Sequence, residues 1–270
     1  MSIPTELHPS SIALLLDVDG TLVEIAARPD AVRVDARLLD RLRSVNSLGG
    51  GAVALVSGRT IADLDRLFAP LQLPCAGLHG FERRGARGSH FRRPMPRGIA
   101  MQAARRAVLR AAAQYPALLV EDKQFAVALH YRRAPHLEGV VREVMSAVAA
   151  ETQLELELQL GKKVAELRPR GANKAAAVHE FLQEPPFRGR YPIYIGDDLT
   201  DESAFEQINQ AGGLSIGVDI RRPSAARARL GSVQAVRQWL AEWPRRVRLE
   251  VQEFPIAPRG EPEPLFGPTA

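Results

Sequence analysis

The sequence has a single cysteine, Cys75, and few aromatic residues, which make up 6% of its 270 positions. One cysteine excludes an intramolecular disulfide bond and any zinc site built from several cysteines, and it favours a reducing cytoplasm. No apolar run approaches the roughly 18 residues that a membrane-spanning helix needs. The first residues lack the basic segment of a signal peptide. We therefore expect a cytoplasmic protein with no membrane partner.

A net charge of +5 and a pI near 9.8 are compatible with an anionic partner, either a polyanion or a phosphorylated metabolite. Basic residues gather between Arg83 and Arg97, but aromatic side chains that could stack on bases are almost absent from this stretch. We therefore predict a solvated basic face and no nucleic-acid binding. With 46% hydrophobic and 25% charged residues, the chain can form one large or two modest globular domains.

The sequence is organised around a short apolar run that ends abruptly in carboxylates. Residues 12–16 are typical of a buried parallel strand, and Asp17 and Asp19 follow it directly. Ligands of open α/β sheets bind beyond the carboxyl ends of such strands. Gly20 permits a tight turn there, and two neighbouring carboxylates can hold a hard cation. The structural alternative is a strand end whose aspartates only cap a turn.

Two patterns of apolar residues predict two kinds of structure. The first is a doubly wound parallel sheet, with strands at 12–16, 52–56, 192–195 and 214–218 and helices at 35–45, 60–68, 173–182 and 233–239. The second is an α+β module, with helices at 97–114 and 137–150 and strands at 125–131, 154–160 and 164–168. The strict alternation of 154–160 indicates an antiparallel hairpin that turns at Gly161. We predict a discontinuous core (1–82 and 169–243), an inserted module (83–168) and a proline-rich tail (244–270).

Polar residues follow three of the predicted parallel strands, and together they suit phosphoryl transfer. Ser57 and Asp197 follow two strands as Asp17 follows the first, and Lys174 opens an intervening helix. Asp17 can attack phosphorus, and a magnesium ion between Asp17 and Asp197 would cancel their repulsion. Ser57 can donate to a phosphoryl oxygen, and Lys174 can stabilise the transition state. Asp19 can protonate the departing sugar oxygen and then activate water.

These motifs resemble, in the same order, the four motifs of the haloacid dehalogenase (HAD) superfamily: residues 17–21, Ser57, Lys174 and residues 196–202. Within it, residues 57–59, 78–80, 128–132, 161–169 and 196–202 resemble the trehalose-6-phosphate phosphatase branch. The resemblance covers about residues 12–239. It implies a Rossmann-like core with an inserted, mobile type-2 cap. It also implies a magnesium-dependent phosphatase that hydrolyses trehalose 6-phosphate through an aspartyl-phosphate intermediate.

The resemblance assigns residues to roles. It implies that Asp17 is the nucleophile, that Asp19 is the general acid/base, and that Asp17, Asp19 (through its backbone oxygen) and Asp197 bind Mg²⁺. The implied cap contacts to the sugar are Glu121, Lys123, Arg132, Lys162 and Glu166. Charged groups of this kind make the stronger hydrogen bonds to sugar hydroxyls. Arg59 and His79 complete the candidate substrate-binding set, although Arg59 could instead pair with an acid and His79 could be packed in a loop.

Other interpretations stay open. The chain could be a related phosphatase acting on sucrose 6-phosphate or mannosyl-3-phosphoglycerate, or a non-catalytic module that binds a sugar phosphate. Asp201 and Glu202 could either support the metal site or only stabilise a helix N-terminus. A trehalose-6-phosphate synthase in the same pathway is a candidate partner.

Overall fold

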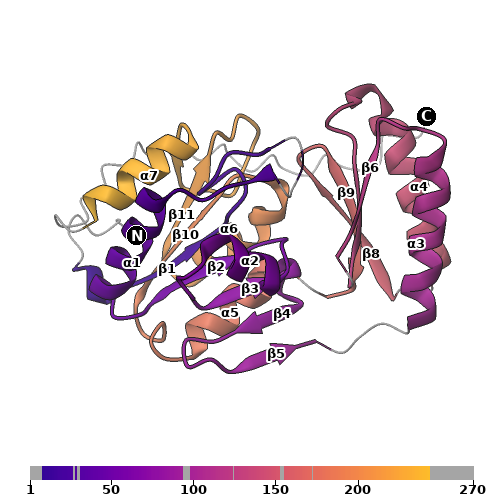
Figure 1. Cartoon of the computed structure of the whole chain (residues 1–270). Coiled ribbons are helices and arrows are strands. Elements are labelled where there is room, and N and C mark those ends of the chain that lie inside the picture. The colour runs from indigo at the N-terminus through magenta and orange to yellow at the C-terminus, as the bar shows by residue number, and fades with distance from the viewer. Residues whose placement is uncertain are drawn as a thin grey trace, which may run out of the picture.

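The computed structural model describes residues 8–26, 28, 31–93, 98–123, 125–152, 155–171 and 173–243, so the predicted tail lies outside the described residues. Within these ranges the chain forms an eight-stranded sheet and a four-stranded sheet. Figure 1 shows the two sheets side by side, each with its own helices. In the same ranges, no helix combines the length and the apolar character needed to cross a membrane.

The eight-stranded sheet has the order β12-β11-β10-β1-β2-β3-β4-β5. Its strands are β1 (Ile12–Leu16), β2 (Val53–Val56), β3 (Cys75–Gly77), β4 (Glu82–Arg84), β5 (His90–Arg92), β10 (Tyr191–Gly196), β11 (Leu214–Val218) and β12 (Ala228–Leu230). The strands from β12 to β3 are parallel, and β4 and β5 add an antiparallel edge. The chain runs outward from β1 on one side and returns to β10 on the other, so the strand order reverses at β1, where doubly wound folds bind ligands.

Both faces of this sheet are covered, which explains its unbroken apolar runs. Ile12, Leu14 and Leu16 of β1 point to one face, and Ala13 and Leu15 point to the other. The first face packs against α1 (Ala36–Leu48), α2 (Ile61–Phe68) and α7 (Val233–Glu242). The second packs against α5 (Lys174–Gln183) and α6 (Glu202–Gln210). We call this sheet with its helices the core.

The four-stranded sheet is antiparallel, with the order β6-β7-β9-β8. It consists of β6 (Leu119–Asp122), β7 (Val127–His130), β8 (Leu156–Gly161) and β9 (Val164–Pro169). Helices α3 (Gly98–Ala113) and α4 (Glu138–Glu151) cover the face turned away from the core (Figure 1). The other face is turned toward the core. We call the described residues from 98 to 169 the cap.

The predicted fold class, a Rossmann-like core with an inserted α+β cap, is confirmed, and so is the hairpin at Gly161, where β8 pairs with β9. The predicted boundary at residue 83 is not where the sheets divide, because β4 and β5 extend the core sheet. Arg83 and Arg84, expected in a solvated basic turn, instead make ion pairs with Glu184 and Asp65 of the core, each at 2.7 Å. Strands β4, β5, β6 and β12 were not predicted.

Candidate active site

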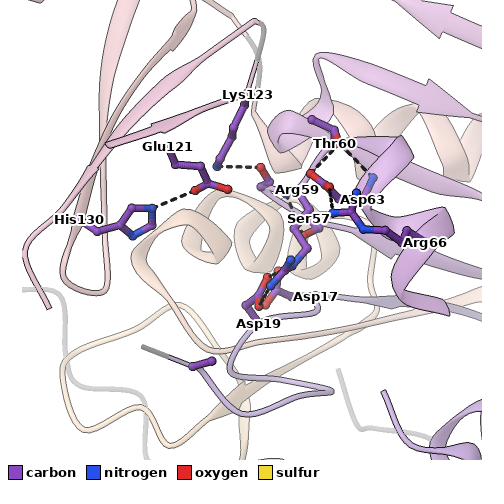
Figure 2. Close-up of polar contacts among 12 residues, drawn as sticks. Asp17, Asp19, Ser57, Arg59, Thr60, Asp63, Arg66, Glu121, Lys123 and His130 are labelled. Atoms are coloured by element: carbon purple, nitrogen blue, oxygen red, sulfur yellow. Dashed lines mark hydrogen bonds and ion pairs between the residues drawn. The ribbon is translucent and has the colours of Figure 1, made fainter. Parts of the chain in front are cut away.

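The predicted site residues lie around one cavity of about 150 Å³ between the core and the cap. On one side is the edge of the core sheet at which β1, β2 and β10 end, and on the other is the uncovered face of the cap sheet. Figure 2 shows Glu121, Lys123 and His130 of the cap facing Asp17 and Asp19 of the core. All twelve predicted residues line this cavity: Asp17, Asp19, Ser57, Arg59, His79, Glu121, Lys123, Arg132, Lys162, Glu166, Lys174 and Asp197. Their individual roles stay predictions.

Asp17 and Lys174 form a buried ion pair in this cavity. Asp17 follows β1 directly, and its backbone N–H donates to the carbonyl oxygen of Ile195 in β10 at 2.9 Å. Lys174 is the first residue of α5, whose N-cap Asn173 accepts a hydrogen bond from the N–H of Ala176. Lys174 Nζ lies 2.6 Å from Asp17 Oδ1, and the two side chains are 3% and 7% exposed. The strand and the helix therefore fix both groups of the pair.

Asp201, ambiguous in the sequence, is the second partner of Lys174. Its Oδ1 accepts from Lys174 Nζ at 2.6 Å and from the Tyr194 hydroxyl at 2.5 Å. Its Oδ2 accepts the backbone N–H groups of Asp197 and Asp198 at 3.0 and 2.9 Å. The side chain is fully buried. Asp201 therefore orients Lys174 and shapes the turn that carries Asp197.

The carboxylates of this cluster face too little positive charge. Oxygen atoms of Asp17, Asp197 and Asp201 lie within 4.8 Å of one another, while Lys174 supplies one ammonium group to two of them. Lys162 of the cap, with its Nζ 3.6 Å from Asp197 Oδ2, is a second ammonium group near them, so one formal negative charge of the three is left over. Burial and the neighbouring carboxylates raise the pKa of Asp17 to about 7 and also raise that of Asp197, although Lys174 acts in the opposite direction on Asp17 and Lys162 does so on Asp197. Burial disfavours the charged form of Lys174, but Asp17 and Asp201 outweigh it and raise the Lys174 pKa.

The same place has the room and the oxygen atoms for a divalent cation. Asp197 Oδ2 is buried and has no hydrogen-bond partner within the described ranges. Gly20 has a φ of +87°, and a Cβ there would lie only 2.1 Å from Asp197 Oδ2, so the close approach requires glycine. Carboxylate and carbonyl oxygens are the ligands that Mg²⁺ prefers. The residues therefore fit the predicted ion, with Asp17 and Asp197 as carboxylate ligands and the backbone oxygen of Asp19 as the further ligand that the resemblance implies.

The Asp19 carboxylate is held by Arg59 (Figure 2). Arg59 Nε lies 2.6 Å from Asp19 Oδ2, and Arg59 Nη2 lies 2.6 Å from Asp19 Oδ1. Of the two roles that the sequence left open for Arg59, the acid partner is the one present here. Ser57 Oγ accepts the backbone N–H of Arg59 at 3.1 Å, and its own O–H can still donate into the cavity.

His79 belongs to a backbone segment in a rare conformation. Leu78 and His79 have φ values of 49° and 56°, in the left-handed region that residues other than glycine seldom adopt. Their N–H groups donate to the carbonyl oxygens of Arg59 and Ser57 at 2.8 and 2.9 Å, so the strained segment supports the loop after β2. Burial, together with Arg168 and other cations, lowers the pKa of His79 well below its usual value. The His79 ring is therefore neutral.

The cap contributes two carboxylates. Glu166 Oε2 pairs with Lys123, while Oε1 lies 3.7 Å from His79 Nε2 and has no hydrogen-bond partner within the described ranges. Glu121 Oε2 lies 2.9 Å from His130 Nε2 (Figure 2). Burial disfavours the charged form of Glu121, but the hydrogen bond from His130 and the charge of Lys123 outweigh it and lower the Glu121 pKa. Ionised Glu121 and the free oxygen of Glu166 offer acceptors to a polar ligand.

Two cationic side chains also tie the cap to core backbone. Lys123 Nζ donates to the carbonyl oxygen of Gly58 at 3.0 Å, and Arg132 donates to the carbonyl oxygen of Ala26. Burial opposes the charged form of Lys123, but Glu166 and other carboxylates outweigh it and raise its pKa. The cavity is therefore enclosed by side chains that carry charge and hydrogen-bond to both parts of the molecule.

The cavity is also lined by residues outside the predicted site set: Ile25, Ala26, Val32, His130, Gln159, Val164 and Thr200. Of these, the sequence favoured strand packing for His130. The signal for Gln159 was present, because the hairpin register places it directly opposite Glu166. Ile25, Ala26 and Val32 belong to no periodic pattern in the sequence, so nothing predicted that they would reach the cavity.

Comparisons with known proteins agree with this geometry. Residues 15–233 match the family model described as trehalose-phosphatase. Trehalose-6-phosphate phosphatase of Escherichia coli (strain K12) is 40% identical over 234 residues, covering 84% of this chain and 85% of that protein. The C-terminal domain of C. albicans trehalose-6-phosphate phosphatase has a TM-score of 0.78 at 21% identity, covering 87% of this chain and 92% of that one. BT1666 of Bacteroides thetaiotaomicron, a HAD-superfamily phosphatase, has a TM-score of 0.58 at 16% identity, covering 90% and 98%. These two structures show the fold.

Proposed function

Because this chain belongs to the trehalose-phosphatase family and is therefore a phosphoric monoester hydrolase, we propose that it hydrolyses trehalose 6-phosphate to trehalose and phosphate, with Mg²⁺ as cofactor. The observation that carries the proposal is that a buried carboxylate–ammonium pair, Asp17 and Lys174, shares one cavity with the carboxylates of the cap. The first group suits attack on phosphorus, and the second suits a ligand rich in hydroxyl groups.

In the proposed first step, a carboxylate oxygen of Asp17 forms a bond to phosphorus while the bond from phosphorus to the sugar oxygen breaks. Asp19, which takes up a proton from solvent once it has left Arg59, gives that proton to the departing oxygen, and trehalose leaves. In the second step Asp19 takes a proton from water, whose oxygen attacks phosphorus as the bond to Asp17 breaks. Phosphate leaves, and both aspartates return to their starting states. Asp19 must exchange Arg59 for substrate before either transfer, because Arg59 holds both of its carboxylate oxygens.

Several groups would hold the phosphoryl group during these steps. Lys174 brings a positive charge beside Asp17, and the Ser57 hydroxyl can donate to a phosphoryl oxygen. When bound, the magnesium ion would supply positive charge that offsets the repulsion between the attacking carboxylate and the anionic phosphoryl group. Residues Asp17, Asp197 and the backbone oxygen of Asp19 would hold it.

The cap would select the sugar. We assign the contacts with glucose to five cap residues: Glu121, Lys123, Arg132, Lys162 and Glu166. His79 of the core would add a supporting contact. Glu166 Oε1 and His79 Nδ1 have no hydrogen-bond partner within the described ranges, so a sugar hydroxyl there would satisfy buried polar atoms. Arg59 and the cap cations also make the cavity favourable for an anionic ester.

Phosphate release from a panel of esters tests the proposal. We expect release from trehalose 6-phosphate in magnesium, and none after the protein is treated with EDTA. Release only from sucrose 6-phosphate or mannosyl-3-phosphoglycerate would make the chain a related sugar phosphatase. Binding of these esters without any release would make it a non-catalytic module. The synthase partner and the cytoplasmic location stay predictions.

A further inference from the structure

The turn between β8 and β9 brings a lysine of the cap into the carboxylate cluster of the core. Lys162 Nζ lies 3.6 Å from Asp197 Oδ2, and its side chain is 51% exposed. Within the described ranges Lys162 is the basic side chain that pairs with Asp197. The contact therefore joins a half-exposed cation to a carboxylate that is only 2% exposed.

The backbone of this turn is seated on the core, so the position of Lys162 does not depend on its own side chain. The N–H of Lys162 donates to Asp198 Oδ2 of the core at 2.9 Å, and within the cap its carbonyl oxygen accepts from Arg132 Nη2 at 3.2 Å. A Cβ at Gly161 would lie 2.9 Å from Asp198 Oδ2, so the residue before Lys162 must be small for this approach. Asp198 is itself fixed, because its Oδ1 accepts the N–H of Leu199 at 2.7 Å.

The oxygen that Lys162 faces is the one that a cation would need. Asp197 Oδ2 is buried without a hydrogen-bond partner within the described ranges, and the 3.6 Å separation from Lys162 Nζ is an ion pair too long for a hydrogen bond. Asp17 and Asp201 lie beside it, with Lys174 already engaged by both. An ammonium group at this place compensates part of the charge that a divalent cation would otherwise neutralise.

We propose that the Lys162 ammonium group is the resident counter-ion of Asp197 in the cation-free protein and that a divalent cation displaces it. The inference rests on the proposed cation site. Displacement would leave an exposed ammonium group at the mouth of the cavity, free to turn to the anionic ester. The Lys162 side chain would then impose an order of binding in which the cation binds before the substrate.

The neighbouring residue provides a matched control. Lys163 is 45% exposed, close to the value for Lys162, but its Nζ lies 4.0 Å from Glu138 Oε2 in the cap. It also lies over the ring of Tyr131, 5.9 Å from the centroid. Replacing either lysine by glutamine removes the same charge from the same turn, and only one of the two touches Asp197.

The first test is binding of Mn²⁺ to the EDTA-treated, substrate-free protein, followed by the electron paramagnetic resonance signal of the free ion. We expect Lys162→Gln to bind Mn²⁺ about three- to tenfold more tightly than wild type, because the cation no longer competes with an ion pair. Lys163→Gln should change the affinity by less than about twofold at physiological salt. Equal affinities in the three proteins, an equal gain in both variants, or no Mn²⁺ binding would overturn the proposal.

The second test follows the ammonium group itself. In protein whose lysines carry ¹³C-methyl groups, added Mg²⁺ should shift the Lys162 signal, assigned by its loss in Lys162→Gln, and leave the Lys163 signal in place. A Lys162 signal that does not respond would refute displacement. Neither test needs turnover. A protein that behaves as expected but hydrolyses no sugar phosphate would retract the proposed function alone, and normal hydrolysis with equal Mn²⁺ affinities would retract this inference alone.

Discussion

Replacing Asp17 by asparagine should stabilise the cation-free protein while abolishing turnover. Burial and the neighbouring carboxylates raise the pKa of Asp17 from its ordinary value of 3.8 to about 7. Asparagine keeps a carbonyl oxygen that can accept from Lys174 Nζ, which lies 2.6 Å from Asp17 Oδ1. Its uncharged amide group replaces the second carboxylate oxygen, which in the wild-type protein adds negative charge to the cluster. It cannot act as the proposed nucleophile.

The size of the effect follows from the difference between the folded and unfolded pKa values. The unfolded carboxyl group ionises near 3.8, while the folded one keeps its proton to about 7. The folded state therefore binds more protons in this window, and the wild-type protein loses stability as the pH rises through it. At about 1.4 kcal/mol per pKa unit the loss approaches about 4 kcal/mol above about pH 7. The neutral hydrogen bond to Lys174 is weaker than the charged one, so we expect a net gain of about 1–3 kcal/mol for Asp17→Asn.

Urea denaturation in EDTA measures this gain as a free energy of unfolding, at about pH 5 and about pH 8. The advantage of Asp17→Asn should be largest at the higher pH and should shrink on acidification. Asp40→Asn is the matched control, because the Asp40 side chain is 72% exposed on α1 and pairs only with Arg43 in the described structure. The reasoning fails if Asp17→Asn is the less stable protein at about pH 8, or if its advantage does not depend on pH.

Three further predictions concern the cation, the cap and the loop after β2. Mg²⁺ added to EDTA-treated wild-type protein should raise Tm, and Asp17→Asn should show a smaller rise; equal rises would contradict the ligand assignment. Glu166→Gln should lower kcat/KM for trehalose 6-phosphate by about tenfold or more and leave p-nitrophenyl phosphate hydrolysis unchanged, whereas equal losses on both would argue against sugar recognition. Glu82→Gln should cost about 1–2 kcal/mol in thermal unfolding, because buried Glu82 accepts the N–H of Ile61 at 2.7 Å and pairs with Arg92; an unchanged Tm would count against this support.

The parallel core could be predicted because burial on both faces leaves a strong trace in the sequence. Residues 12–16 are apolar without interruption since Leu14 and Leu15 point to opposite, equally covered faces. The first charged residue, Asp17, then marks the strand end. Because parallel strands present their carboxyl ends at one edge, the sequence alone indicates that Asp17, Ser57 and Asp197 lie close together.

The strands β4 and β5 could not be predicted in the same way. Residues 82–92 are rich in arginine, and in a sequence taken alone such a run predicts a solvent-exposed segment. The partners that neutralise two of these charges come from distant segments: Glu180 of α5 and Glu184, which directly follows α5, pair with Arg83, and Asp65 of α2 pairs with Arg84. The order of residues within one segment gives no information on ion pairs with residues far away in the sequence.

The partners of Asp201 and Asp19 could not be predicted for the same reason. Asp201 stands where an acid commonly stabilises a helix N-terminus, and the sequence alone could not separate that role from another. Its contacts with Lys174 and Tyr194 depend on how α5 and β10 pack, which only the folded chain fixes. Asp19 likewise meets Arg59 across 40 residues of sequence.

The contacts between cap and core are of two kinds, and the difference indicates how the cap can move. At one place Phe81 of the core packs against Phe125 of the cap, with ring centroids 5.6 Å apart, in a buried apolar cluster. Around the cavity the contacts are hydrogen bonds, such as that from Lys123 to the carbonyl oxygen of Gly58. Water can replace each such bond at a net cost of about 1 kcal/mol. Separating two aromatic side chains would expose enough apolar surface to cost about 3 kcal/mol or more. Of the two kinds of contact, the polar ones are therefore less costly to break, so we expect a cap that opens to rotate about Phe81 and Phe125 and to break the hydrogen bonds around the cavity.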